Sequence, residues 1–120
     1  MMPDDTVYLQ HILDAIQKID MYLAGIDEPS FYAHSLIQDG VIRQLEIIGE
    51  AAKRILPATR SSAPHIPWLA IAGMRDKLIH HYFGVDLKQV WLAVLTDMPT
   101  LKTTVTALLA TRQANQRNRP

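Results

Sequence analysis

The most informative stretch of this chain reads Pro67-Trp68-Leu69-Ala70-Ile71-Ala72-Gly73-Met74-Arg75-Asp76-Lys77-Leu78-Ile79-His80-His81-Tyr82-Phe83-Gly84. Its apolar residues recur at intervals of three or four, which is the spacing of the buried face of an α-helix. Pro67 suits the first turn of such a helix, and Gly84 suits its end. The stretch therefore predicts one amphipathic helix, whose apolar face is formed by Trp68, Ile71, Met74, Leu78 and Tyr82.

The same spacing returns along most of the chain, without the alternation typical of strands and without an internal repeat. Residues 57–67 contain three prolines and two serines, so we expect the main loop there. Pro99 is expected to open or kink a separate final helix. The fold is predicted to be an all-α bundle of about five helices. The periodic residues outside 67–84 are Ile12, Ile16, Ile19 and Leu23; Phe31, Tyr32 and Leu36; Val41, Leu45, Ile48, Ala52 and Ile55; Val90, Trp91 and Val94; and Leu101, Val105 and Leu108.

Length and composition indicate one ordinary globular domain. The chain has 120 residues, 48% of them hydrophobic, which is enough for a single core. We expect residues 1–112 to form this helical domain and residues 113–120 to form a polar, flexible tail. The chain has no cysteine, so disulfides and thiolate metal sites are excluded. No apolar run approaches the roughly 18 residues of a membrane span, and the acidic start does not resemble a signal peptide, so a cytoplasmic protein is expected.

The formal net charge of the chain is zero at neutral pH. Tight non-specific binding to nucleic acid depends on neutralising many phosphates, so a neutral chain argues against it. This balance still allows an RNA-cutting site in which positive charge is focused locally.

Arg75 interrupts the apolar pattern of its helix. On a helical wheel of about 100° per residue, Arg75 lies about 40° from Ile71 and therefore inside the apolar stripe. Burying a guanidinium group without a partner is very costly, so Arg75 should face an interface, a cleft or a carboxylate. Glu46 and Glu50 on the preceding helix are the plain structural partners. Gly49 lies between them, and because glycine costs about 1 kcal/mol in a helix interior, its presence favours a close helix contact.

His80 lies on another side of the same helix, about 140° from Arg75 on the wheel. One straight helix cannot direct both side chains into one small pocket. Either the helix distorts before Gly84, or the site is assembled between two copies of the chain. Asp76 lies four residues before His80 on the same side of the helix, where its carboxylate could orient the imidazole.

Arg75, His80 and Tyr82 form an R-x4-H-x-Y arrangement, which resembles the signature of the HepT branch of the HEPN superfamily. Residues 43–52 resemble the preceding helix of that family, and residues 67–75 and 81–86 resemble the segments on either side of its motif. These segments follow one another in the expected order, which makes the match much more specific than a short pattern alone.

This resemblance implies a HEPN-type helical bundle that forms a two-fold homodimer, with both motifs in one cleft. It also implies a toxin that cuts RNA without a metal or other cofactor, with Arg75 and His80 as catalytic residues and Asp76 as a supporting residue. The implied partner is a minimal nucleotidyltransferase antitoxin, which can silence the toxin by transferring AMP from ATP to the motif tyrosine, here Tyr82. Asp76 departs from the asparagine that often follows the motif arginine, and an unpaired carboxylate there would repel RNA phosphate.

The residue types suit this chemistry. Imidazole titrates near neutral pH and can act as base or acid, and a guanidinium can bind the phosphate oxygens as negative charge accumulates. Cleavage through the 2′-hydroxyl needs both an acid and a base. One chain supplies one motif histidine, His80, so two-fold pairing would supply the second.

Three other interpretations stay open. The chain could be a non-catalytic HEPN subunit that binds or positions a nucleotide substrate for the nucleotidyltransferase, or a purely structural helical adaptor. A metal enzyme is disfavoured, because Asp76, His80 and His81 lack a recognised ligand spacing. The basic tail from Arg112 to Arg119 could touch RNA, but it is interpreted as solvated. The remaining histidines, interpreted as ordinary surface or loop residues, are His11, His34 and His65.

Overall fold

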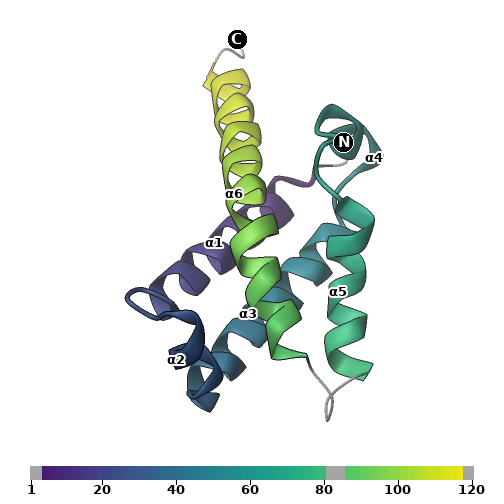
Figure 1. The fold of residues 1–120 in the computed structure, drawn as a ribbon. Coiled ribbons are helices and arrows are strands. Elements are labelled where there is room, and N and C mark those ends of the chain that lie inside the picture. The colour runs from purple at the N-terminus through teal and green to yellow at the C-terminus, as the bar shows by residue number, and fades with distance from the viewer. Residues whose placement is uncertain (1–3, 81–85, 118–120) are drawn as a thin grey trace.

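The structure, a computed structural model, describes residues 4–80 and 86–117, with the side chains of Ile79 and His80 outside the described part. All regular structure in these residues is helical, which confirms the all-α prediction (Figure 1). The described part holds six helices, one more than expected: α1 (Thr6–Tyr22), α2 (Glu28–Tyr32), α3 (Ser35–Lys53), α4 (Pro57–Ser62), α5 (Trp68–His80) and α6 (Leu87–Arg117).

The additional helix, α4, lies in the segment that was predicted to be a loop. Pro57 occupies its first turn, after Leu56 in an extended conformation. Proline is tolerated there because the first N–H groups of a helix have no partner within the helix. In this segment, a proline therefore marks the start of a helix as well as the connection between two helices.

The prediction of a separate final helix at Pro99 is wrong. Residues 87–117 form the single helix α6, with Pro99 inside it. A proline inside a helix costs about 3 kcal/mol. That cost is offset because residues on both sides of Pro99 are buried in the same core, Met98 before it and Leu101 after it. The helix also includes residues 113–117, which were expected to belong to the tail.

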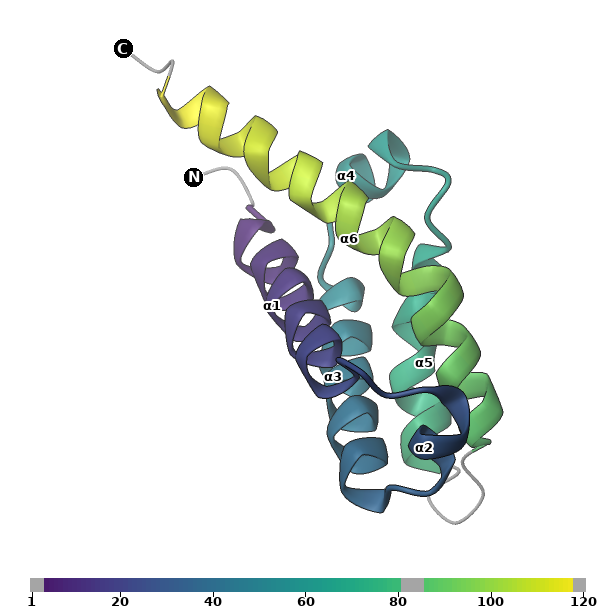
Figure 2. The same ribbon diagram turned by 60° about the vertical axis from the view of Figure 1, so that its left-hand side comes forward.

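Helix α3 lies at the centre of the molecule, packed against α1, α2 and α5, while α1 also packs against α6 (Figure 2). The aromatic rings of Phe31 and Trp91, 5.3 Å apart, connect α2 to α6. The periodic residues of the first and third helices are buried as predicted, except Leu23, which follows the end of α1 and is partly buried. Among the side chains with almost no exposure are Ile12, Ile16, Ile19, Val41, Leu45 and Ile48.

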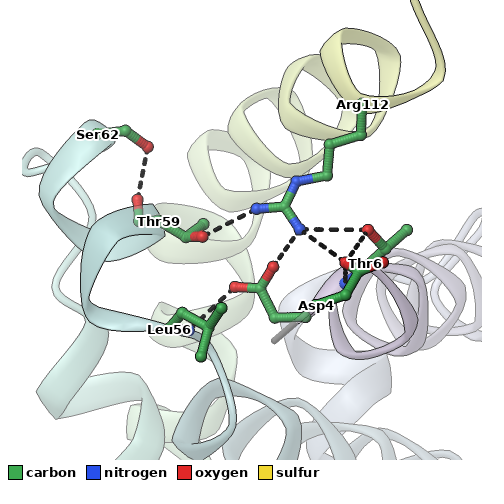
Figure 3. A network of polar contacts seen from close by, with 7 residues as sticks. Asp4, Thr6, Leu56, Thr59, Ser62 and Arg112 are labelled. Carbon is green, nitrogen blue, oxygen red and sulfur yellow. Dashed lines mark hydrogen bonds and ion pairs between the residues drawn. The ribbon is translucent and has the colours of Figure 1, made fainter. Parts of the chain in front are cut away.

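A buried carboxylate joins the two ends of the described chain. Asp5 is 1% exposed, and its Oδ2 accepts a hydrogen bond of 3.0 Å from the backbone N–H of Leu56. Arg112, on α6, donates to Asp5 and, at 2.9 Å, to the hydroxyl of Thr59 (Figure 3). Burial raises the pKa of Asp5, but the hydrogen bonds from Leu56 and Arg112 outweigh burial, so the pKa lies below its usual value. Arg112 is thus a structural residue in this network, contrary to its interpretation as part of a solvated tail.

Candidate functional site

Helices α3 and α5 approach each other closely at Gly49. A Cβ atom at this position would lie 3.0 Å from both the Cβ and the backbone nitrogen of Arg75, and 3.1 Å from the carbonyl oxygen of Ile71. Only glycine leaves room for this contact, which confirms the close helix packing expected at Gly49. The contact places the start of the Arg75 side chain directly over α3.

The guanidinium group of Arg75 reaches a carboxylate on α3. Its Nε lies 3.2 Å from Oε2 of Glu50, and 38% of the Arg75 side chain is exposed. Ile71 and Leu78, which share its wheel face, are buried. Arg75 therefore packs its aliphatic part between the helices and extends its charge to a carboxylate at the surface, as the cost of burying a guanidinium requires.

Asp76, the residue after Arg75, is paired with two cations. Nζ of Lys53 lies 3.2 Å from Oδ1 and 3.3 Å from Oδ2 of Asp76, and Nη1 of Arg75 lies 3.5 Å from Oδ1. A paired carboxylate repels phosphate less than a free one. Lys53 was missed in the sequence, because only the packing of α3 against α5 shows which lysine reaches Asp76.

The other motif residues fall outside what the structure describes. His80 is the last residue of α5, and its imidazole lies outside the described part. Tyr82 lies in residues 81–85, also outside it. The roles of His80 and Tyr82, and the orientation of His80 by Asp76, stay predictions.

Arg75 forms one edge of a surface pocket of about 440 Å³. Its other walls come from α1 and α3, two helices that lie side by side (Figure 2). The pocket has a strongly charged character, because its lining includes five charged residues. These are Arg43, Glu46 and Glu50 of α3, Arg54 directly after α3, and Arg75 of α5. It is large enough for a small ligand, because ligand pockets usually measure about 300–1,000 Å³.

Two pocket residues, Tyr8 and His11, come from α1 and were not singled out as site residues in the sequence. They are three positions apart, so they share one face of the helix, and their rings meet edge to face at 6.0 Å. That spacing can be read from the sequence, but the sequence does not show that arginines lie on the other side of the pocket. His34 and His65, by contrast, have local structural contacts, His34 with the N–H of Ile37 and His65 with the hydroxyl of Thr104.

Nothing in the described residues resembles a metal centre, since no three histidine, aspartate or glutamate side chains gather in a way that could hold an ion. In the same residues, every helix is too short or too polar to cross a membrane.

The family model for HepT-like ribonucleases matches residues 12–108, which include the whole of α3 and α5 and the pocket residues on them. This chain belongs to the HepT-like ribonuclease family. The R-x4-H-x-Y arrangement, residues 75–82, lies within the matched residues. No solved structure matches the chain.

Similar proteins carry ribonuclease names. A protein of Thermococcus cleftensis named probable ribonuclease HepT is 46% identical over 95 residues, covering 79% of this chain and 86% of that protein. A provisionally named RNase of Caldanaerobacter subterraneus is 39% identical over 102 residues, covering 85% of this chain and 91% of that protein. A protein of Methanocaldococcus jannaschii, whose name combines a gamma-glutamylcyclotransferase with a provisionally assigned RNase, is 41% identical over 119 residues. This chain is covered to 99% in that match but spans only 54% of the relative.

Proposed function

We propose that this protein is a metal-independent endoribonuclease and the toxin of a HEPN toxin–antitoxin pair. The observation that supports this best is the placement of Arg75. Glu50 holds its Nε at 3.2 Å, while the side chain stays 38% exposed at the edge of a pocket. A guanidinium that is held in place and accessible to solvent can bind the oxygens of an RNA phosphate as negative charge develops on them.

His80 is the proposed acid and base. Cleavage begins when one imidazole takes the proton of the RNA 2′-hydroxyl, whose oxygen then attacks the adjacent phosphorus. The bond from phosphorus to the 5′-oxygen breaks, and a second imidazole gives that oxygen a proton. The products are a 2′,3′-cyclic phosphate and a free 5′-hydroxyl. Proton transfers of this kind contribute about 10²–10⁴-fold in rate.

Two copies of the chain are needed for this reaction. Arg75 and His80 lie about 7.5 Å apart along the axis of α5 and about 140° apart around it. A two-fold homodimer would bring two guanidinium and two imidazole groups to one groove. We expect sedimentation to show a dimer, and a strictly monomeric protein that still cuts RNA would contradict this arrangement.

The proposed antitoxin is a minimal nucleotidyltransferase that attaches AMP to Tyr82. The hydroxyl of Tyr82 would attack the α-phosphorus of ATP and release pyrophosphate. Tyr82 follows Arg75 by seven residues in the chain, so the added phosphate would bring a negative charge near Arg75 and compete with RNA for it. Incubation with the partner and ATP should increase the intact mass by one AMP in wild type and leave Tyr82→Phe unchanged.

Cleavage of RNA in EDTA by the purified protein tests the main proposal. Wild type should cut, whereas Arg75→Ala and His80→Ala should each lose at least about a hundredfold in rate. His65→Ala is the matched control, because His65 lies on the connection between α4 and α5 and contacts Thr104. If wild type leaves RNA intact, the nuclease proposal fails and the non-catalytic HEPN subunit is favoured. If it cuts only when a divalent metal is added, metal independence fails.

A further inference from the structure

The pocket beside Arg75 combines features that the proposed reaction does not use. It lies between α1 and α3, and Arg75 is the one residue of α5 in its lining within the described part of the chain. Its volume of about 440 Å³ is far more than a phosphate group needs. A single nucleotide, with its base, ribose and phosphate, is of the size that pockets in this range hold.

The charges in this pocket favour an anion. Arg43, Arg54 and Arg75 contribute three guanidinium groups, opposed by the two carboxylates of Glu46 and Glu50. Two of the ion pairs are long, with 3.9 Å between Arg43 and Glu46 and 3.9 Å between Arg54 and Glu50. Exposed pairs at such distances are weak, so these arginines can exchange a carboxylate for a phosphate at little cost.

The aromatic side of the pocket favours a base. Tyr8 is partly buried at the pocket wall, and its ring meets His11 at an interplanar angle of 88°. Proteins that bind single-stranded RNA stack its bases on tyrosine and histidine rings and on the planar guanidinium of arginine. Apolar side chains of α3, Ile47 and Ala51, complete the lining.

We propose that this pocket binds one nucleotide of the RNA strand next to the phosphate that Arg75 engages, with Tyr8 stacking on its base and Arg43 contacting its phosphate. The proposal rests on the proposed ribonuclease function and adds a substrate subsite to it. Arg75 is part of the pocket lining, and this favours RNA over a free nucleotide. An RNA strand whose phosphate is bound at Arg75 has to continue past Arg75, and the pocket lies on one side of it.

The binding of an RNA that cannot be cut tests this subsite. The probe is a fluorescent tetranucleotide with methylated 2′-hydroxyls, which lack the attacking group, and its Kd for the full chain is measured by anisotropy. Tyr8→Ala should raise the Kd about tenfold, since stacking on one ring contributes to affinity to this extent. Tyr8→Phe, which keeps the ring, should stay within about twofold of wild type.

Arg43→Ala supplies a second measurement that does not depend on packing, because 69% of the Arg43 side chain is exposed. The Kd of this variant for the tetranucleotide should be about three- to tenfold higher than that of wild type, and the difference should decrease at high salt. Arg117→Ala is the matched control, since it removes the same charge from an exposed position at the end of α6. Equal Kd values for Arg43→Ala and Arg117→Ala, or wild-type affinity in Tyr8→Ala, would overturn the proposal.

Other occupants of the pocket have their own signatures. If Tyr8→Ala weakens the binding of AMP while RNA affinity is unchanged, the pocket takes a free nucleotide and the RNA subsite is wrong. If Tyr8→Ala and Arg43→Ala convert a dimer to a monomer in sedimentation, the pocket is a surface between copies of the chain. Binding to uncleavable RNA and cleavage of ordinary RNA can fail separately. If the pocket variants lose RNA binding and wild type does not cleave RNA, the nuclease proposal is wrong, whereas the nucleotide-binding site is supported.

Discussion

At the scale of single residues, the environment of Arg75 is set by the two carboxylates that reach it. Glu50 lies across the helix interface, 3.2 Å from Nε, and Asp76 lies beside Arg75 on its own helix, 3.5 Å from Nη1. Asp76 lies closer to Lys53, at 3.2 Å, than to Arg75, whereas Glu50 lies closer to Arg75 than to Arg54, which is 3.9 Å away. We therefore regard Glu50 as a positioning residue that directs the guanidinium toward the pocket.

Glu50→Gln tests this role. The amide is nearly the same size but carries no charge, so Arg75 should sample more orientations and kcat should fall about tenfold. KM should not rise, because removing a negative charge beside the RNA favours binding. The measurement is steady-state cleavage of a defined RNA, with Glu50→Asp expected to restore part of kcat.

Glu28→Gln is the matched control for this substitution. Glu28 is an exposed carboxylate on α2, outside the pocket lining. It should leave both constants close to wild type. A fall in kcat of the same size in Glu28→Gln would show that the effect is one of total charge, and the positioning role would have to be abandoned.

At the scale of helices, the contact between α3 and α5 positions the candidate site. Of the three glycines in these two helices, Gly49 and Gly73 have opposite surroundings. A Cβ at Gly49 would meet the backbone of Arg75 at 3.0 Å, whereas a Cβ at Gly73 would have nothing within 4 Å. The first glycine is required by packing, and the second is not.

Gly49→Ala and Gly73→Ala should therefore change stability in opposite directions. Gly73→Ala should raise the free energy of unfolding by up to about 1 kcal/mol, the helix propensity difference between the two residues. Gly49→Ala should lower it by about 1–2 kcal/mol, because overpacking costs more than propensity returns. Urea denaturation followed by circular dichroism measures both. Equal stabilisation by the two substitutions would mean that α3 and α5 are not in close contact.

At the scale of the whole molecule, the buried Asp5 connects the start of α1 to α4 and α6 (Figure 3). Burial raises the pKa of Asp5, but the hydrogen bonds that it accepts from Leu56 and Arg112 outweigh burial and hold the pKa below its ordinary value of 3.8. A carboxyl with a lowered pKa stabilises the fold above its unfolded pKa, and this contribution is lost as the pH falls through the folded value.

Asp5→Asn should reduce stability at neutral pH by about 2 kcal/mol, because Arg112 loses its buried charged partner and keeps the exposed carboxylate of Asp4. The difference from wild type should shrink as the pH falls below the ordinary value of 3.8 toward the lowered pKa of folded Asp5, because the carboxyl of wild type becomes protonated there. Urea midpoints measured between neutral and acidic pH give this difference. Asp39→Asn, an exposed aspartate of α3, is the control and should follow wild type throughout. A difference that grows toward acidic pH would contradict the ion pair.

Much of the fold could be predicted because helical periodicity is a property of neighbouring residues. The buried faces of α1, α3 and α5, the close contact at Gly49 and the need of Arg75 for a carboxylate all follow from local spacing and from the cost of burying charge. The family could be recognised for a similar reason, because its motif and the flanking helices are continuous in the chain.

Only the tertiary structure decided which partners these residues have. Packing selected Glu50 rather than Glu46 for Arg75. It brought Tyr8 and His11 of α1 into one pocket with Arg43 and Arg54, and it paired Asp5 with Arg112, 107 positions away. It also kept α6 continuous through Pro99, because the core buries residues on both sides of the proline. Such contacts depend on how helices that are distant in the chain pack together, and a local pattern of residues does not determine this packing.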